Sequence, residues 1–155
     1  MPVLIEKNIQ PFFAFSYLHK ALNEKNSRLM WINATISAEL AFKEFLSIID
    51  PRSSSLITYA PSPPLGRLYK EVLQDYIGQK SPVCKELSKG AEIRNALIHK
   101  NHQLAPEFEK AMVYIHQVQV AIFHLYTCLY PEDDFFKYLY ESSLNKLKLY
   151  SGQPR

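Results

Sequence analysis

Prolines constrain the fold of this chain more than any other residue type. Ten prolines and only four glycines occur in 155 residues, and the prolines fall between long segments whose apolar residues recur with helical spacing. A proline opens or ends a helix because its ring fixes φ and removes the backbone N–H group. So few glycines argue against an all-β chain with many tight turns, and no segment of useful length alternates with the period of a strand. The sequence therefore predicts an all-α fold.

The spacing of prolines, polar runs and apolar residues predicts six helices. We expect them at residues 12–22, 28–50, 67–78, 82–101, 106–130 and 131–150. The second is apolar almost all round, which is typical of a central, buried helix. Together they predict a single domain over residues 1–155, built as a five- to six-helix up-down bundle. Its core is expected at about residues 8–130, followed by a C-terminal helix at about residues 132–150.

Several residues indicate where these helices begin and end. Ser27 is expected to cap the second helix, and Gly78 to end the third. Ser81, with Pro82 behind it, is expected to open the fourth. The loop at residues 51–66 holds four prolines and four serines. A loop of this length is typically functional or without fixed structure.

Composition narrows the class of function. The net charge of +3 and the isoelectric point near 8.8 are compatible with a nucleic-acid partner without requiring one. No glycine-rich phosphate-binding loop occurs. His116 and His124 lie eight residues apart with no acidic residue at matching spacing. We therefore expect no cofactor and no metal ion.

The cysteines and the hydropathy pattern bear on location. Cys84 and Cys128 lie 44 residues apart and outside any CxxC motif, which is typical of reduced thiols in a cytosolic protein. The N-terminus has neither the basic region nor the long apolar region of a signal peptide, and no apolar run is long enough to cross a membrane. We therefore expect a cytoplasmic protein that does not enter a membrane.

Arg94 occupies an unusual position on the expected fourth helix. In "GAEIRNALIHKNH", residues 90–102, a helical wheel places Arg94 on an apolar arc between Leu87 and Leu97. Its guanidinium cannot lose its charge, so burial requires a partner or an interface. His99 follows five residues later, about 140° round the helix and about 7.5 Å along its axis. Arg94 and His99 would converge only if the helix loosens near His99 or if a twofold interface joins two copies.

These residues also allow a purely structural interpretation. Arg94 can extend its charged end toward solvent, and His99 suits a helix C-terminus, where a cation is favoured. His102 can likewise be a solvated residue at a helix end.

Glu39 raises a similar question on the expected second helix. It lies on an apolar surface, so its carboxylate needs a cation, and Lys43 and Arg94 are the candidates. An exposed Glu39–Lys43 pair would contribute only ~0.3 kcal/mol. We predict that Arg94 and Glu39 lie close together, directly or through Asn95, and that Glu44 on the same helix is exposed.

Two segments together resemble a known family. "AEIRNALIHK", Ala91–Lys100, resembles the HEPN signature, in which an Arg, an Asn, three further residues and a His lie on the penultimate helix of a small helical bundle. "ISAELAFKEFL", Ile36–Leu46, resembles the Glu-x-x-x-Lys pattern of the long HEPN helix. The order of the expected helices is also similar, over roughly residues 8–130.

The resemblance implies a metal-independent endoribonuclease that acts as a homodimer, as a toxin or a defence effector. The two motifs would face each other across a cleft that holds RNA, with Arg94, Asn95 and His99 as the catalytic residues and Glu39, Lys43 and His102 in support. The RNA 2′-hydroxyl would attack the adjacent phosphodiester. His99 would move the proton and Arg94 would stabilise the phosphate charge. Asn95 would orient His99 or hold the phosphate.

One position departs from a subgroup of the family. HEPN toxins paired with small nucleotidyltransferase antitoxins commonly carry a tyrosine two positions after the histidine, and Asn101 stands there in this chain. This argues against a system in which that tyrosine is modified and leaves open an antitoxin protein of another kind. Two alternatives remain. One is a non-catalytic HEPN-like bundle that binds RNA, nucleotide or a partner protein. The other is a helical adaptor in which Arg94 pairs internally with Glu39.

Overall fold

The computed structural model describes residues 13–53, 63–100 and 104–150, and all regular structure in these ranges is helical, as predicted. The helices are α2 (Phe13–Asn23), α3 (Ser27–Ile49), α7 (Cys84–His99), α8 (Phe108–Leu129) and α9 (Asp134–Tyr150). A sixth, continuous helix consists of α5 (Leu65–Arg67), the π-helical turn η2 (Leu68–Val72) and α6 (Leu73–Ile77), and a 3₁₀ turn η1 (Pro51–Ser53) follows α3. Within the described ranges, no helix has the length and apolar character needed to cross a membrane.

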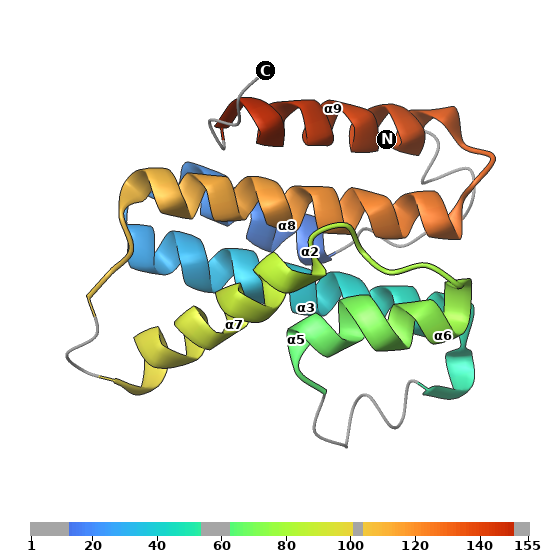
Figure 1. The fold of residues 1–155 in the computed structure, drawn as a ribbon, viewed down its shortest axis with the longest axis horizontal. Coiled ribbons are helices and arrows are strands. Elements are labelled where there is room, and N and C mark those ends of the chain that lie inside the picture. The colour runs from blue at the N-terminus through green and yellow to red at the C-terminus, as the bar shows by residue number, and fades with distance from the viewer. Residues whose placement is uncertain (1–12, 54–62, 101–103, 151–155) are drawn as a thin grey trace.

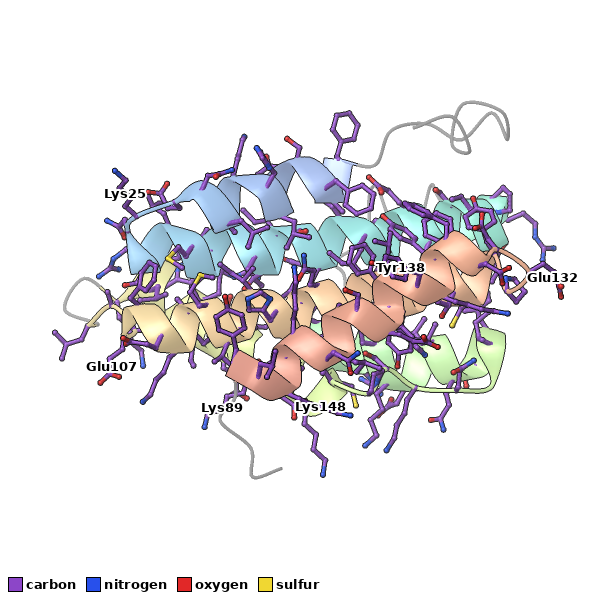
Figure 2. All side chains as sticks on the ribbon, turned by 90° about the horizontal axis from the view of Figure 1, so that it is seen from above. Lys25, Lys89, Glu107, Glu132, Tyr138 and Lys148 are labelled. Atoms are coloured by element: carbon purple, nitrogen blue, oxygen red, sulfur yellow. The ribbon has the colours of Figure 1, made fainter. Side chains whose placement is uncertain are left out.

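The two longest helices, α3 and α8, lie against each other at the centre of the fold (Figure 1). Helix α2 packs beside α3, and α9 packs against α8, as the view from above also shows (Figure 2). The core between them is rich in fully buried rings, which are Phe42, Phe45, Tyr69, Tyr114, Tyr126 and Phe136. Phe136 belongs to α9, so the C-terminal helix contributes to the core.

The helices do not alternate strictly up and down. Tyr69 donates a hydrogen bond to the carbonyl of Ala38 at 2.7 Å, and Tyr76 donates to the carboxylate of Asp50 at 2.9 Å. The acceptors Ala38 and Asp50 follow each other along the chain in the same order as the donors Tyr69 and Tyr76. Helix α5–α6 therefore runs parallel to α3. The connection from Ile49 to Leu65 is long enough to allow this arrangement. The predicted alternation therefore fails at this one pair of helices.

Several helix starts differ from the sequence expectations, and at two of them the expected capping residue is wrong. Asn26, not Ser27, caps α3, because its Oδ1 accepts hydrogen bonds from the N–H groups of Arg28 and Leu29 at 2.9 and 3.2 Å. Helix α7 begins at Cys84 rather than Pro82. The N–H of Ser81 is bonded to Tyr69 in the preceding helix at 2.8 Å, which holds Ser81 in the connector and leaves only a turn before α7.

The expected end of the third helix is confirmed. Gly78 follows Ile77 with a φ of 86°, in the left-handed region where glycine carries no Cβ penalty. The loop predicted at residues 51–66 lies largely outside the described residues, which resume at Pro63.

Glu44 is not the exposed residue that the sequence suggested. Its Oε1 accepts the N–H of Phe13, the first residue of α2, at 2.8 Å, and its Oε2 is buried. The carboxylate therefore caps the start of α2 from the neighbouring helix. Burial raises the pKa of Glu44, and the backbone hydrogen bonds from Phe13 and Ala14 oppose that rise.

This cap gives a stability prediction with a defined sign. A raised pKa in the folded state means that Glu44 contributes stability at low pH and loses it as pH rises through that pKa. Glu44→Gln keeps an acceptor for Phe13 without a charge, so it should raise the melting temperature at neutral pH, by an amount that shrinks as the solution is acidified. Glu44→Ala should instead cost about 1 kcal/mol through loss of the cap. Thermal unfolding of the three proteins across pH checks this, and a Gln variant less stable than Ala at neutral pH would contradict it.

Candidate functional site

Arg94 lies on the middle of α7 and points toward α3. Its Nη1 donates to Oε1 of Glu39 at 2.7 Å, and the two side chains are 17% and 32% exposed. The predicted proximity of Arg94 and Glu39 is confirmed. The pair is only partly withdrawn from water, so its strength lies between those of a surface pair and a buried pair. One ion pair thus joins the two segments on which the family resemblance was based.

The other motif residues lie on or beyond the exposed part of α7. Asn95 is exposed, and its Oδ1 accepts a hydrogen bond from Nε of Arg94 at 3.0 Å. His99 is the last residue of α7 and is also exposed. Because α7 remains a regular helix to His99, about 140° of rotation separates His99 from Arg94. One chain therefore does not bring Arg94 and His99 together.

The other two supporting residues named in the sequence analysis, Lys43 and His102, have different outcomes. Lys43 is half-buried on α3, and among the described residues no ion pair joins it to Glu39. The interpretation of Glu39 as one half of a surface Glu–Lys pair is therefore wrong, because the Glu39 carboxylate forms its ion pair with Arg94. His102 lies outside the described residues.

A pocket of about 460 Å³ opens beside Arg94, between α7 and the start of α5. Its polar side comprises Glu39, Arg94 and Asn95 with Ser88 and Glu92, and its other side is formed by Pro63, Pro64, Leu65, Gly66 and Ala91. The two helices approach closely here, because a Cβ on Gly66 would lie 2.5 Å from Cβ of Ser88. The pocket therefore offers one guanidinium and one amide together with two carboxylates.

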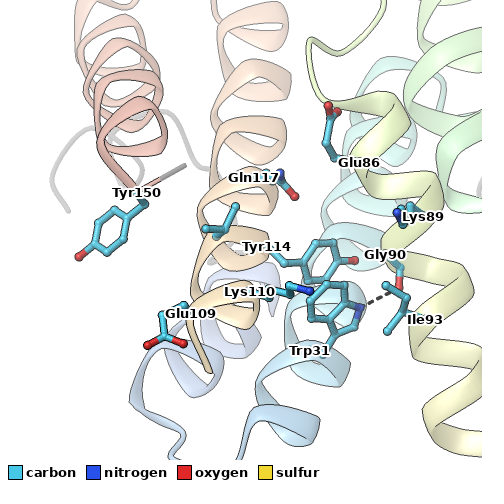
Figure 3. A pocket seen from close by; sticks show the side chains of 11 residues that line it. Trp31, Glu86, Lys89, Gly90, Ile93, Glu109, Lys110, Tyr114, Gln117 and Tyr150 are labelled. Carbon is cyan, nitrogen blue, oxygen red and sulfur yellow. Dashed lines mark hydrogen bonds between the residues drawn. The ribbon is translucent and has the colours of Figure 1, made fainter. Parts of the chain in front are cut away.

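A buried network, not foreseen from the sequence, fixes α7 in place. Nε1 of Trp31 donates to the carbonyl of Gly90 at 2.8 Å (Figure 3), and the rings of Trp31 and Tyr114 stack at 4.1 Å. The Thr35 hydroxyl donates to the carbonyl of Trp31, so Tyr114 donates to Thr35, at 2.7 Å. These contacts join α3, α7 and α8 one helical turn from Arg94.

Tyr114 lies within electrostatic reach of the ion pair. Burial raises the pKa of Tyr114 well above its ordinary value. The hydrogen bond with Thr35 and the charge of Arg94 lower that pKa, whereas the charge of Glu39 raises it. Tyr114 therefore stays a neutral phenol that packs behind the pair.

Among the described residues, the other thiols and imidazoles form no second centre of this kind. Cys84 and Cys128 are free, and burial lowers the pKa of both His116 and His124. Burial also raises the pKa of Cys128, which lies 3.9 Å from Nε2 of His124, so neither partner of that contact is charged at neutral pH. In the part of the chain that the structure describes, no group of three or more His, Cys, Asp or Glu residues could hold a metal ion.

Removing one partner of the Arg94–Glu39 pair should cost stability. Glu39→Ala leaves the guanidinium in a partly buried position without its carboxylate, and we expect a loss of about 1–3 kcal/mol in the free energy of unfolding. Glu141→Ala, an exposed change on α9, is the control and should stay within about 0.5 kcal/mol of wild type. Urea denaturation measures both, and equal midpoints for the two variants would contradict the role of the pair.

The chain matches no protein-family model, no curated protein and no solved structure. The assignment of a function therefore rests on the residues of the chain itself and on the geometry of α3 and α7.

Proposed function

We propose that this protein is a metal-independent endoribonuclease of the HEPN type, with a HEPN-like bundle that acts as a homodimer. The observation that carries the proposal is the ion pair between Arg94 and Glu39, which are 55 residues apart in the sequence. Each belongs to one of the two segments that resemble the family, and the fold brings them to 2.7 Å. The contact supports the proposal because it joins the two segments that carry the resemblance.

The proposed chemistry uses groups that α7 already presents. The 2′-oxygen of RNA forms a bond to phosphorus as the bond to the 5′-oxygen breaks, leaving a 2′,3′-cyclic phosphate and a 5′-hydroxyl. One His99 imidazole accepts the 2′-proton, and a second His99, in protonated form, donates a proton to the leaving oxygen. Arg94 has guanidinium hydrogens beyond those given to Glu39 and Asn95, and these stabilise the crowded phosphate.

A second copy supplies what one chain lacks. Arg94 and His99 face different directions on α7, so a complete site needs two copies of the helix. Helices α3 and α8 begin, and α7 ends, at the same end of the bundle (Figure 1). Four large apolar side chains at or next to these helix ends are exposed, and they are Leu29, Ile98, Leu104 and Phe108. Arg28 ties this end of α3 to α7 through a 2.9 Å bond to the carbonyl of Leu97. Burial of these side chains against a second copy would stabilise a dimer.

The expected setting follows from the same proposal. A ribonuclease with free cysteines suits the cytoplasm, where it would act as a toxin or a defence effector. A protein antitoxin that covers the cleft is then a further expected partner.

One observation favours a second candidate function. Glu39 already balances the charge of Arg94 within a single chain, so the arginine does not require RNA or a second copy. A non-catalytic HEPN-like bundle that binds RNA, nucleotide or a partner protein would need only this internal pair. A helical adaptor would need no more.

RNA cleavage in the absence of metal tests the proposal. The purified protein is mixed with long single-stranded RNA in excess EDTA, and the product ends are analysed. We expect 2′,3′-cyclic phosphate and 5′-hydroxyl ends, and a 2′-deoxy nucleotide at the cut site should block the cut because it removes the nucleophile. Sedimentation at micromolar concentration should give a dimer. Intact RNA together with a monomer would favour the non-catalytic bundle.

A further inference from the structure

Two histidines of α8 are buried where α9 packs on that helix. His116 and His124 are each only 5% exposed. The ring of Tyr150, at the end of α9, stacks on that of His116 with 4.3 Å between the ring centroids. The ring of Tyr140, nearer the start of α9, lies 5.5 Å from that of His124. Both imidazoles therefore belong to the interface between α8 and α9.

Each imidazole has one nitrogen that donates a hydrogen bond to a glutamine. Nδ1 of His116 lies 3.3 Å from Oε1 of Gln119. Nε2 of His124 lies 3.1 Å from Oε1 of Gln79, in the connector before α7. An amide oxygen only accepts, so these two nitrogens carry the ring protons. The other two nitrogens, Nε2 of His116 and Nδ1 of His124, are buried and have no hydrogen-bond partner among the described residues. An added proton would therefore sit on a buried atom that has no acceptor.

The groups that face His116 do not favour a positive charge there. They are the amide of Gln119, the phenol of Tyr150 and the ammonium group of Lys146, which α9 contributes. Burial lowers the pKa of His116, and the charge of Lys146 lowers that pKa further, whereas the hydrogen bond with Gln119 raises it. A protonated His116 would thus lie near a second cation.

His124 also lacks a compensating charge. Its neighbours are the amide of Gln79, the thiol of Cys128 and the phenol of Tyr140. Burial raises the pKa of both Cys128 and Tyr140, so neither is charged at neutral or acid pH, and burial lowers the pKa of His124. Helices α2, α3 and α7 also pack on α8, and no carboxylate of their described residues forms an ion pair with either imidazole.

Helix α9 depends on this one interface. In the described part of the chain, its extensive contact is with α8 alone, and it lies at the edge of the bundle (Figure 1). Its buried residues are Phe136, which packs on Tyr126 and Tyr130 of α8, and Ser143. A helix held through a single interface can open as a unit while the rest of the fold remains intact.

We propose that acidification releases α9 from α8 while the other helices stay packed, and that His116 and His124 take up the protons. In the packed state, each proton would place a positive charge in a buried site without an acceptor. In the released state, water solvates both rings. Because both pKa values are lower when α9 is packed, the packing of α9 is strongest above the pKa of a free imidazole, about 6.5, and weakens as pH falls below it.

Amide hydrogen exchange of the full chain, read by mass spectrometry of its peptides, tests the inference. Rates are measured from about pH 7.5 to about pH 5 and divided by those of unstructured peptides at the same pH. Each histidine can change the ratio of released to packed helix by up to about tenfold per pH unit. We expect the corrected exchange in the middle of α9 to rise by about tenfold or more across this range. It should also remain faster than that of α3 at every pH, because α9 opens without global unfolding.

The double variant His116→Phe with His124→Gln removes both protonation sites. Phenylalanine keeps a ring against Tyr150, and the new amide keeps a donor for Gln79. The corrected exchange of α9 in this variant should vary by less than about twofold with pH. Each single variant should lose about half of the pH dependence on a logarithmic scale, and the two serve as the test if the double variant does not fold.

His19→Gln is the matched control. His19 is an exposed histidine of α2, and this variant should keep the pH dependence of the wild type. Three results would overturn the inference. They are exchange of α9 that does not rise on acidification, equal exchange of α9 and α3, and a pH dependence that removal of the two histidines leaves intact. None of these measurements depends on whether the protein cuts RNA.

Discussion

Replacement of His99 by alanine should slow RNA cleavage by about 100-fold or more, because it removes the proposed proton shuttle. The same change should hardly affect stability. His99 is exposed at the last position of α7, where an imidazole contributes at most about 1 kcal/mol through the helix dipole. A large loss of rate with a preserved melting temperature would separate a catalytic role from a structural one. Cleavage rates with excess enzyme, measured beside circular dichroism, give both quantities.

A second exposed histidine supplies the control for His99. His19 lies on α2, where it contacts Asn23, and His19→Ala should cut RNA at the wild-type rate. Arg94→Ala is a less informative variant, because it also leaves the Glu39 carboxylate without its ion-pair partner and should lower the stability of the fold. If His99→Ala cuts RNA as fast as wild type, the assignment of the proton shuttle is wrong.

Gly90→Ala should destabilise the protein by about 3 kcal/mol, although alanine is the better helix former. The new Cβ would lie 2.1 Å from Cε1 and 2.5 Å from the hydroxyl oxygen of Tyr114. The Tyr114 ring cannot move aside, because it stacks on Trp31 and is hydrogen-bonded to Thr35. For a chain of this size, the loss corresponds to a fall in melting temperature of about 6–12 °C.

The neighbouring residue and a double variant test the cause of that loss. Lys89→Ala changes an exposed side chain on the same turn and should stay within about 0.5 kcal/mol of wild type. Tyr114→Leu removes the ring atoms that the new Cβ would meet. The double variant Gly90→Ala with Tyr114→Leu should therefore lose less stability than the sum of the single changes. Strict additivity would contradict steric overlap as the cause.

Local signals predicted the helices, and one long-range contact followed from electrostatics. The prolines and Gly78 marked helix boundaries because their effect on φ acts within the residue itself. The contact between Arg94 and Glu39 was predictable because each charge lay on an apolar helical face and needed the opposite sign. Lys43 was an equally good candidate by spacing, and only the packing of α7 against α3 decides between them.

Other features depend on packing that a single sequence does not specify. The parallel course of α3 and α5–α6 is one of them, because helix periodicity does not indicate in which direction the next helix runs. Glu44 looked like a surface residue because its partner is a backbone N–H of another helix rather than a side chain. One residue in the sequence did indicate the close packing at Tyr114. Gly90 lies inside a helix, where glycine is unfavourable unless another group needs the space.

The contacts at Gly90 also bear on the order in which the chain folds. They join Trp31 to a residue 59 positions later, and Thr35 to Tyr114 over 79 positions, so large loops must close before either contact exists. Most helical contacts are local and form early. Contacts between residues this far apart in the sequence raise the contact order and slow folding. The emission of the single tryptophan should therefore reach its native value in the last kinetic phase of refolding, after the far-ultraviolet signal of the helices has recovered.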